Sequence, residues 1–377
     1  MKNQFPKIRF LILPLLIISV GVARLNSQTP TDNPPPLDNY QETQEKLCRE
    51  QSVSGKRTYT FRTLPRATEL DGAYGKIPWY KKFLPFFKAP EDKYGIDDIR
   101  FLRSEYGRPA PVGESKRSKR MRLSFEQKLA EAGQQQEARL PKFDWRENGL
   151  NVGEVGFQGF RCNTCWAFAT ADAMQISRQL LAVRSQKTDF DKNVRPSVRQ
   201  LISCVVPKDA DYCKINWHGE AFSFMVDKGL PLGGTSKYVA NKSGYVCDAE
   251  TFVKALTWDF VSATPQKPAS TEEIKRALVT YGPVVSMLYF DSCLWLYGGG
   301  VFNEEQNQNG THMVLIVGWD DEKGAWLIKN SYGADWGEDG FGWVKYGSNN
   351  IGQFSAFVVA DPKEEERITR EFGQAKK

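Results

Sequence analysis

The chain has 377 residues, enough for one large domain with extensions or for two domains. Its net charge of +6 comes from the front part: residues 1–139 carry 25 Lys and Arg against 16 Asp and Glu, whereas residues 140–377 are net negative. No basic stripe falls on the back part, so charge argues against a nucleic-acid partner. The opposite signs instead suit a front segment that docks on the rest of the chain and is later removed.

The N-terminus has the pattern of a targeting segment. Residues 2–9 carry three basic side chains, and the fourteen residues that follow are almost wholly apolar. This pattern predicts a secretory signal peptide over residues 1–23, with cleavage after Ala23 or Ser27. A membrane anchor is the alternative, but Pro14 interrupts the apolar run, which falls short of the roughly 20 residues that a span needs. We therefore expect export to an extracellular, lysosomal, vacuolar or periplasmic location, with no stable membrane insertion.

Residues 24–139 form a region of mixed composition. The polar, proline-rich residues 28–39 predict a linker. The basic run 116–122 suits proteolytic trimming, although a solvated charge run explains it equally well. Residues 125–137 then predict a helix with its apolar positions on one side.

A pair of cysteines precedes the clearest helical pattern. Cys162 and Cys165 lie in the stretch 158–169, which begins like a turn. Small and apolar residues then recur at the spacing of one helix face: Ala169, Ala173, Ile176, Leu180 and Val183. Cys165 therefore lies at or just before a helix N-terminus, where unpaired N–H groups and the helix dipole favour a thiolate.

A thiol nucleophile needs a base, and the chain has two histidines. His218 lies in the loop after Cys213 with no motif around it, so a core residue is the simpler interpretation. His312 lies in the apolar run 310–319, which predicts a buried strand. Further strands are predicted by runs of β-branched and aromatic residues at 258–261, 283–290, 313–319, 326–329, 342–346 and 356–359.

The order of these motifs resembles the papain/cathepsin family of cysteine proteases. It combines Gln…Cys-Trp-Ala-Phe with a strand His and then with Asn-Ser-x-Gly…Trp-Gly-Glu-x-Gly. His312 follows Cys165 by 147 residues and Asn330 follows it by 165, which fits the family's downstream His and slightly exceeds its Asn spacing. The resemblance runs from Pro141 to Ala360. It implies an α+β, papain-like two-lobed fold, with a helical lobe, a β-barrel-like lobe and the active-site cleft between them.

The resemblance also implies the function and the site. The protein is expected to be a secreted cysteine endopeptidase, made as a zymogen, that cleaves polypeptides through a thioester acyl-enzyme. Cys165 would be the nucleophile, His312 the base and acid, Asn330 the residue that orients His312, and Gln158 an oxyanion donor. The residues implied for substrate binding are Ile215, Asn216, His218, Thr311 and Trp336.

The sequence departs from the family pattern around the cleft. One residue more than in papain separates Gln158 from the nucleophile, and Asn163-Thr164 replaces the usual Gly-Ser. The loop 214–218 lacks the family's Asn-Gly-Gly start, which lets substrate backbone approach closely. Tyr332 stands where the family has Trp. These departures leave one alternative, a papain-like binding protein that has lost turnover.

Seven cysteines make disulfides the default in an exported chain. Of the six after residue 140, Cys165 is the candidate nucleophile, and Cys293, in an apolar run, is expected to be a buried core thiol. The other four allow three pairings. The resemblance selects Cys162 with Cys213 and Cys204 with Cys247. A zinc site or a dithiol oxidoreductase would use Cys162 and Cys165 differently, but neither explains the His312 and Asn330 motifs.

The resulting organisation has four parts: a signal peptide at 1–23, a propeptide or N-terminal module at 24–139, a catalytic domain at 140–363 and a charged tail at 364–377. The front region lacks the interspersed Glu-Arg-Phe-Asn-Ile-Asn helix pattern typical of many family propeptides. It is nevertheless expected to act as the enzyme's own inhibitor. We expect a monomer that uses no cofactor and no metal.

Overall fold

The computed structural model describes residues 40–51, 57–62, 138–159, 162–184, 196–206, 213, 216–232, 238, 246–249, 251–304, 310–364 and 367. All of them belong to one compact unit that spans residues 37–377. The predicted signal peptide, the basic run and the helix expected at 125–137 lie outside these residues. Among the described helices, none has the length and the apolar character needed to cross a membrane.

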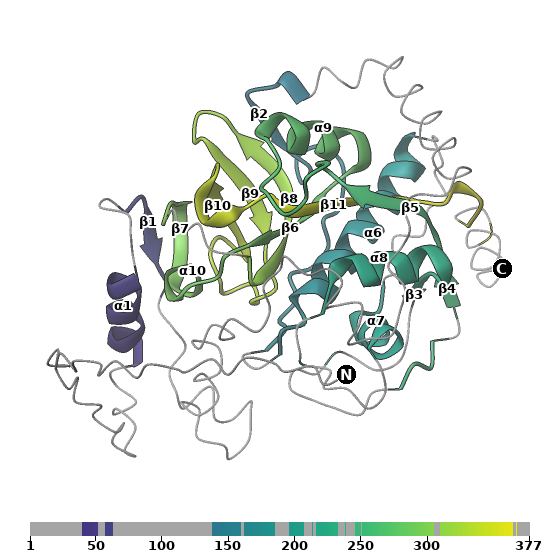
Figure 1. Cartoon of the computed structure of the whole chain (residues 1–377), viewed down its shortest axis with the longest axis horizontal. Helices are drawn as coiled ribbons and strands as arrows, with labels where there is room; N and C mark the ends of the chain where they lie inside the picture. Colours follow the sequence, from purple (N-terminus) through teal and green to yellow (C-terminus); the bar gives the residue numbers. More distant parts are fainter. Residues whose placement is uncertain are drawn as a thin grey trace, which may run out of the picture. The chain divides into compact units, whose positions relative to one another are not determined.

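A nine-stranded sheet forms one half of the fold, in the order β1-β7-β10-β9-β8-β6-β11-β5 with β2 paired to β8 (Figure 1). Its strands are β1 (Tyr59–Phe61), β2 (Lys142–Asp144), β5 (Ala255–Phe260), β6 (Val284–Leu288), β7 (Tyr297–Phe302), β8 (His312–Asp320), β9 (Ala325–Lys329), β10 (Phe341–Lys345) and β11 (Gln353–Ala360). Every residue of β6, β8 and β11 is buried, and most residues of these strands are apolar. The six predicted strand runs coincide with β5, β6, β8, β9, β10 and β11.

Helices make up most of the other half. They are α6 (Cys165–Arg184), α7 (Val198–Val205) and α8 (His218–Asp227), with a small sheet of β3 (Leu230–Leu232) and β4 (Thr251–Val253) beside them (Figure 1). The long helix α6 packs on α7 and α8 and also against β8 and β11, so it joins the two halves. The expected α+β arrangement, with a helical part and a sheet part, is confirmed.

The face predicted for α6 is correct at four positions and wrong at its end. Val183 is 60% exposed, although it continues the apolar spacing. The last turn is oriented instead by Arg184, whose guanidinium donates at 2.6 Å to the Val279 and Thr280 carbonyls at the end of α9 (Thr271–Tyr281). These bonds satisfy carbonyls that a helix end leaves unpaired.

Helix α9 lies over the sheet and begins with a capping box. The Ser270 hydroxyl accepts from the Glu273 N–H at 3.2 Å, and the Glu273 carboxylate accepts from the Ser270 N–H at 2.8 Å. Two N–H groups that would lack partners at the helix start are thereby satisfied. This local pattern explains why α9 starts at Thr271.

Three disulfides lie within the described chain. The structure pairs Cys162 with Cys213 and Cys204 with Cys247, the two pairs that the resemblance implies. The third bond joins Cys48 to Cys293, so the interpretation of Cys293 as a free core thiol is wrong. Because Cys165 is the free cysteine, neither a zinc site nor a Cys162–Cys165 dithiol fits this arrangement.

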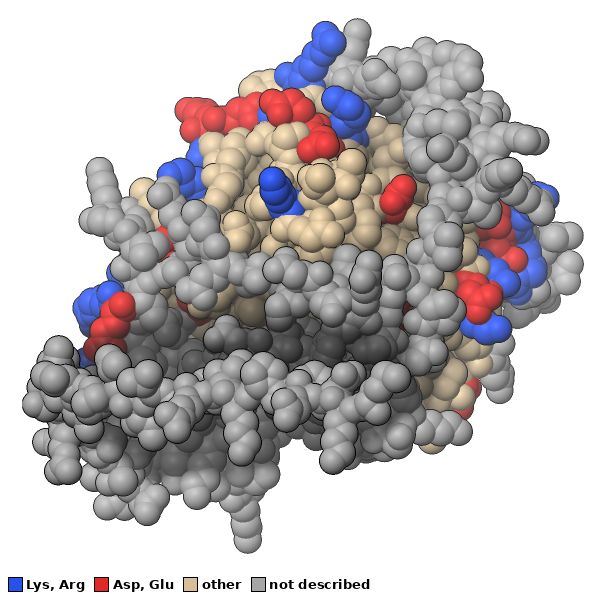
Figure 2. Space-filling view, in the orientation of Figure 1, with Lys and Arg blue, Asp and Glu red and all other residues tan. Residues whose placement is uncertain are grey.

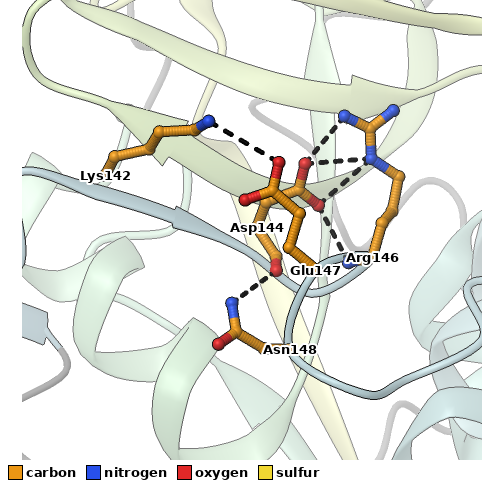
Figure 3. Close-up of polar contacts among 5 residues, drawn as sticks. All are labelled: Lys142, Asp144, Arg146, Glu147 and Asn148. Atoms are coloured by element: carbon orange, nitrogen blue, oxygen red, sulfur yellow. Dashed lines mark hydrogen bonds and ion pairs between the residues drawn. The ribbon is translucent and has the colours of Figure 1, made fainter.

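Strand β2 pairs with β8 and holds residues 142–144 against the sheet. The Asp144 carboxylate accepts three charge-assisted bonds from the Arg146 guanidinium, at 2.7, 3.0 and 3.1 Å, and the Asp144 carbonyl accepts from the Asn148 amide at 2.6 Å (Figure 3). Lys142 and Glu147 add an ion pair at 3.6 Å, which is exposed and therefore weak. The turn after β2 is thus held by the buried Asp144 carboxylate.

Figure 2 shows one face on which uncharged residues predominate and acidic and basic groups are interspersed. On the described part of that face no continuous basic stripe is visible.

The predicted C-terminal tail is anchored at Arg367. The guanidinium of this residue donates to the Phe252 carbonyl at 2.6 Å.

Candidate active site

Cys165 opens helix α6 and lies against strand β8. The helix begins with bonds from the Ala167 and Phe168 N–H groups to the Thr164 carbonyl, so Cys165 is in its first turn. The side chain is 1% exposed and is not in a disulfide. Burial raises the pKa of the Cys165 thiol to about 11, while a hydrogen bond from the Met313 backbone acts in the opposite direction. The residue next to His312 therefore contacts the thiol.

His312 is the first residue of β8 and is paired with Asn330, which directly follows β9. The His312 Nε2 atom lies 2.8 Å from the Asn330 Oδ1 atom. An amide oxygen can only accept, so this bond places the ring proton on Nε2 and leaves Nδ1 as the atom that can take a proton. The Asn330 oxygen also accepts from the Ser331 N–H at 2.8 Å, which holds the amide in place.

The charge state of His312 follows from its burial. The side chain is 3% exposed, and desolvation lowers its pKa to about 4, opposed by the bond to Asn330. These shifts favour a neutral imidazole beside a neutral thiol. Each group would shift the other toward ionisation, because a thiolate favours an imidazolium and an imidazolium favours a thiolate.

Aromatic rings cover His312 on the sheet side. Tyr332 stacks on the imidazole, with ring centroids 4.7 Å apart and an angle of 21°. Trp336 packs edge-on against Tyr332 at 6.1 Å, and Phe290 lies edge-on to His312 at 6.0 Å. The ring in direct contact with the imidazole is thus Tyr332, the residue that replaces the family's Trp.

The Gln158 side chain is bonded at both ends of its amide. Its Nε2 donates to the Cys162 carbonyl at 2.6 Å, and its Oε1 accepts from the Ser331 hydroxyl at 2.6 Å. A backbone bond from Gln158 N to the Ser331 carbonyl at 2.9 Å ties the same two segments together. One of the two amide hydrogens is used by the Cys162 carbonyl, and the other is the one that could donate to a substrate oxygen. Sequence reasoning missed Ser331 as the residue that holds Gln158, although it lies inside the Asn-Ser-x-Gly motif.

The residues implied for substrate binding occupy different environments. Asn216 is 4% exposed and accepts from the Trp217 N–H, whereas Thr311 is half-buried and its hydroxyl accepts from the Phe290 N–H at 3.2 Å. Trp336 is fully buried and donates to the Leu294 carbonyl at 2.9 Å. Ile215 lies outside the described residues. Their roles toward substrate stay predictions.

His218 is as fully buried as Trp336. It is 0% exposed, and among the described residues neither ring nitrogen has a hydrogen-bond partner of good geometry. Its ring lies against Trp217 at 4.1 Å and edge-on to Phe222 and Phe260. Burial lowers its pKa to about 3, opposed only in part by the Phe354 backbone. In this environment the side chain behaves as a neutral core aromatic.

A buried free cysteine at a helix start, beside a His–Asn pair on an adjacent sheet, defines the class of thiol-dependent hydrolases that use such a triad. The model of the papain family cysteine proteases matches residues 140–360, more than half of the chain. The chain belongs to the papain family of cysteine proteases.

Known relatives are similar over the same region. Gamete and mating-type specific protein A of Dictyostelium discoideum is 28% identical over 214 residues, 56% of this chain and 44% of that protein. Cathepsin S of Bos taurus is 32% identical over 209 residues, 54% of this chain and 59% of that protein. The chain thus spans less than two thirds of the length of both relatives. Among solved structures, the proform of the Amb a 11 cysteine protease from ragweed pollen is 27% identical, with a TM-score of 0.49 over 59% of this chain and 66% of that one.

Proposed function

We propose that the protein is an endopeptidase that hydrolyses polypeptides through Cys165, His312 and Asn330. The observation that carries the proposal is the 2.8 Å contact between His312 Nε2 and Asn330 Oδ1, on a strand that lies against the buried, free Cys165. If His312 were only a structural core residue, there would be no reason for it to have an orienting amide partner and to lie near a free thiol at a helix start. Together the three groups supply an attacking atom, a proton carrier and a group that orients it.

The chemistry proceeds in two stages. His312 Nδ1 takes the proton from the Cys165 thiol, and the thiolate attacks the carbonyl carbon of the scissile amide. The oxyanion is stabilised by the Cys165 backbone N–H and by the amide hydrogen of Gln158 Nε2 that the Cys162 carbonyl does not use. His312 then protonates the leaving amine as the C–N bond breaks, and a thioester remains on Cys165. Water, deprotonated by His312, hydrolyses the thioester and restores the thiol.

We also propose that the enzyme is exported and made as a precursor whose front region restrains it. Three disulfides in the described chain suit an oxidising compartment. Cleavage before Leu140 would create a new N-terminus that stays bonded to the end of β8 and the turn after it. Trp319 donates to the Leu140 carbonyl at 3.0 Å, and the Pro141 carbonyl accepts from the Asp321 N–H at 2.7 Å. The proposed parts remain residues 24–139 as propeptide or module and 140–363 as a monomeric catalytic domain.

The proposal is tested by alkylating the processed protein with iodoacetamide at about pH 5, where a thiol with an ordinary pKa near 8.5 hardly reacts. Mass spectrometry locates the label, and casein cleavage is followed in parallel. We expect rapid labelling of Cys165 with simultaneous loss of cleavage, and neither label nor cleavage in Cys165→Ser. A Cys165 that stays unlabelled, in a protein that does not cleave casein, would leave the binding-protein alternative as the better account.

A further inference from the structure

The front region of the chain is covalently joined to the catalytic region. Helix α1 (Tyr40–Gln51) packs against the short helix α10 (Ser292–Leu296), and Cys48 of α1 is bonded to Cys293 of α10. Figure 1 shows both elements beside β7, at the edge of the sheet. Both cysteines are 0% exposed, and 245 residues of chain separate them. A cut anywhere between residues 62 and 138 would leave this bond intact.

Strand β1 extends the sheet next to this bond. It pairs antiparallel with β7, with Tyr59 opposite Gly300 and Phe61 opposite Tyr297. Backbone bonds continue at both ends, from the Val301 N–H to the Thr58 carbonyl at 3.0 Å and from the Arg62 N–H to the Leu296 carbonyl at 2.8 Å. Such strand addition satisfies an edge that would otherwise present free N–H and carbonyl groups.

The sequence of β7 is adapted to this close approach. A Cβ atom at Gly298 would lie 2.5 Å from the Arg62 nitrogen, and one at Gly300 would lie 2.7 Å from the Thr58 carbonyl oxygen. Any side chain at either position would therefore push β1 away. The glycines are suited to a neighbouring strand that stays in place.

The contact between β1 and the catalytic region has a buried centre. Tyr59 is 6% exposed, its ring lies 4.9 Å from that of Phe302, and its hydroxyl donates to the fully buried Glu304 carboxylate. Burial and Glu304 together raise the pKa of Tyr59, so the phenol stays protonated and remains a donor. Losing β1 would leave the Glu304 carboxylate without this bond, which is costly for a buried charge.

A line of contacts leads from this segment to the catalytic histidine. The Arg62 guanidinium lies 4.5 Å from the centre of the Trp295 ring, and its Nε donates to the Trp295 carbonyl at 3.1 Å. Trp295 packs edge-on against Tyr332 at 5.1 Å, and Tyr332 is the ring stacked on His312. The segment therefore supports the aromatic wall of the site.

We propose that residues 40–62 are not discarded with the rest of the front region but stay on the mature enzyme as a second chain, bound to α10 and β7 through the Cys48–Cys293 disulfide. The inference rests on one part of the proposed function, namely that the precursor is cut between the front region and residue 140. The partner of this surface is a segment of the same chain, and its release requires a reductant after the peptide chain has been cut.

One arm of the test needs no activity. The full chain carrying Cys165→Ser is cut briefly with trypsin at the basic run 116–122 and analysed by intact mass and denaturing electrophoresis without reductant. We expect the peptide that contains Cys48 to remain joined to the catalytic chain and to separate when dithiothreitol is added. Adding Cys48→Ser should free the peptide without reductant. If Cys48 is alkylated by N-ethylmaleimide in the denatured, unreduced parent, the inference is overturned.

The second arm uses the processed wild-type enzyme. Active molecules are captured through Cys165 with a biotinylated iodoacetamide, washed in denaturant without reductant, and then treated with dithiothreitol. We expect the Cys48 peptide to elute at that step. Capture without the Cys48 peptide would overturn the inference while the proposed function stands. Failure of capture, with a joined Cys48 peptide in the first arm, would refute the proposed function and leave the inference standing.

Discussion

His218 offers a direct test of how burial controls charge in this fold. Its pKa is lowered from 6.5 to about 3 because the ring is fully buried among aromatic side chains. In the unfolded chain the imidazole binds a proton below about pH 6.5, whereas the folded protein resists it until about pH 3. The unfolded state therefore binds more protons in this window, so the stability present above pH 6.5 is lost as the pH falls toward 3.

The size of the effect follows from the width of the window. Each pKa unit corresponds to about 1.4 kcal/mol, so the full difference is roughly 5 kcal/mol and the part lost between pH 6.5 and 4.5 is roughly 3 kcal/mol. His218→Phe removes the titrating group and keeps a flat ring against Trp217. Replacing a buried polar group that lacks partners by an apolar one of similar shape is nearly neutral or stabilising at pH 7.

The measurement is urea unfolding, followed by tryptophan fluorescence, at several pH values from 3.5 to 7. Both proteins carry Cys165→Ser to prevent self-digestion. His312, whose pKa is lowered to about 4, titrates in both proteins and cancels in the comparison. We expect the variant to lose clearly less stability on acidification. If the free energy of unfolding falls equally with pH in the two proteins, the reasoning is refuted. A separate assay uses His218→Phe in the protein that keeps Cys165. A changed preference for substrate side chains in that variant would show that the His218 ring faces substrate.

Three further predictions concern the site and the frame that holds it. Asn330→Ala leaves the buried Nε2 of His312 without its acceptor, at a cost of about 1–3 kcal/mol, so kcat/KM on a peptide substrate should fall roughly tenfold to a hundredfold; an unchanged kcat/KM would remove the orienting role. Gln158→Ala should lower kcat by about a hundredfold with little change in KM, because it removes the amide hydrogen that would donate to the oxyanion. A kcat that hardly changes would show that Gln158 does not donate to the oxyanion. Ser270→Ala removes the cap of α9 and should lower the free energy of unfolding by about 1 kcal/mol, measured as a lower urea midpoint, whereas an unchanged midpoint would show that the cap is dispensable.

The sequence alone determined the class of chemistry and much of the secondary structure that holds the site. The start of α6 at Cys165 and the buried strand of His312 were predictable because they depend on local spacing and on continuous apolar runs. The family's motif order then implied which residues form the site. The number of cysteines would also have allowed a further prediction. After Cys165 is set aside, six cysteines remain, which is an even number. Once the other four are paired, Cys48 and Cys293 are left as the third pair, which is the bond in the structure.

Tertiary structure decided what depends on contacts between distant parts of the chain. No local pattern shows that Cys48 bonds to Cys293, that Tyr332 rather than Trp336 stacks on His312, or that Val183 faces solvent. A disulfide or a ring contact depends on where two backbones meet, and that is set by the packing of all elements together. The charge state of His218 is of the same kind, because desolvation by side chains from several elements, and not the residue itself, lowers its pKa.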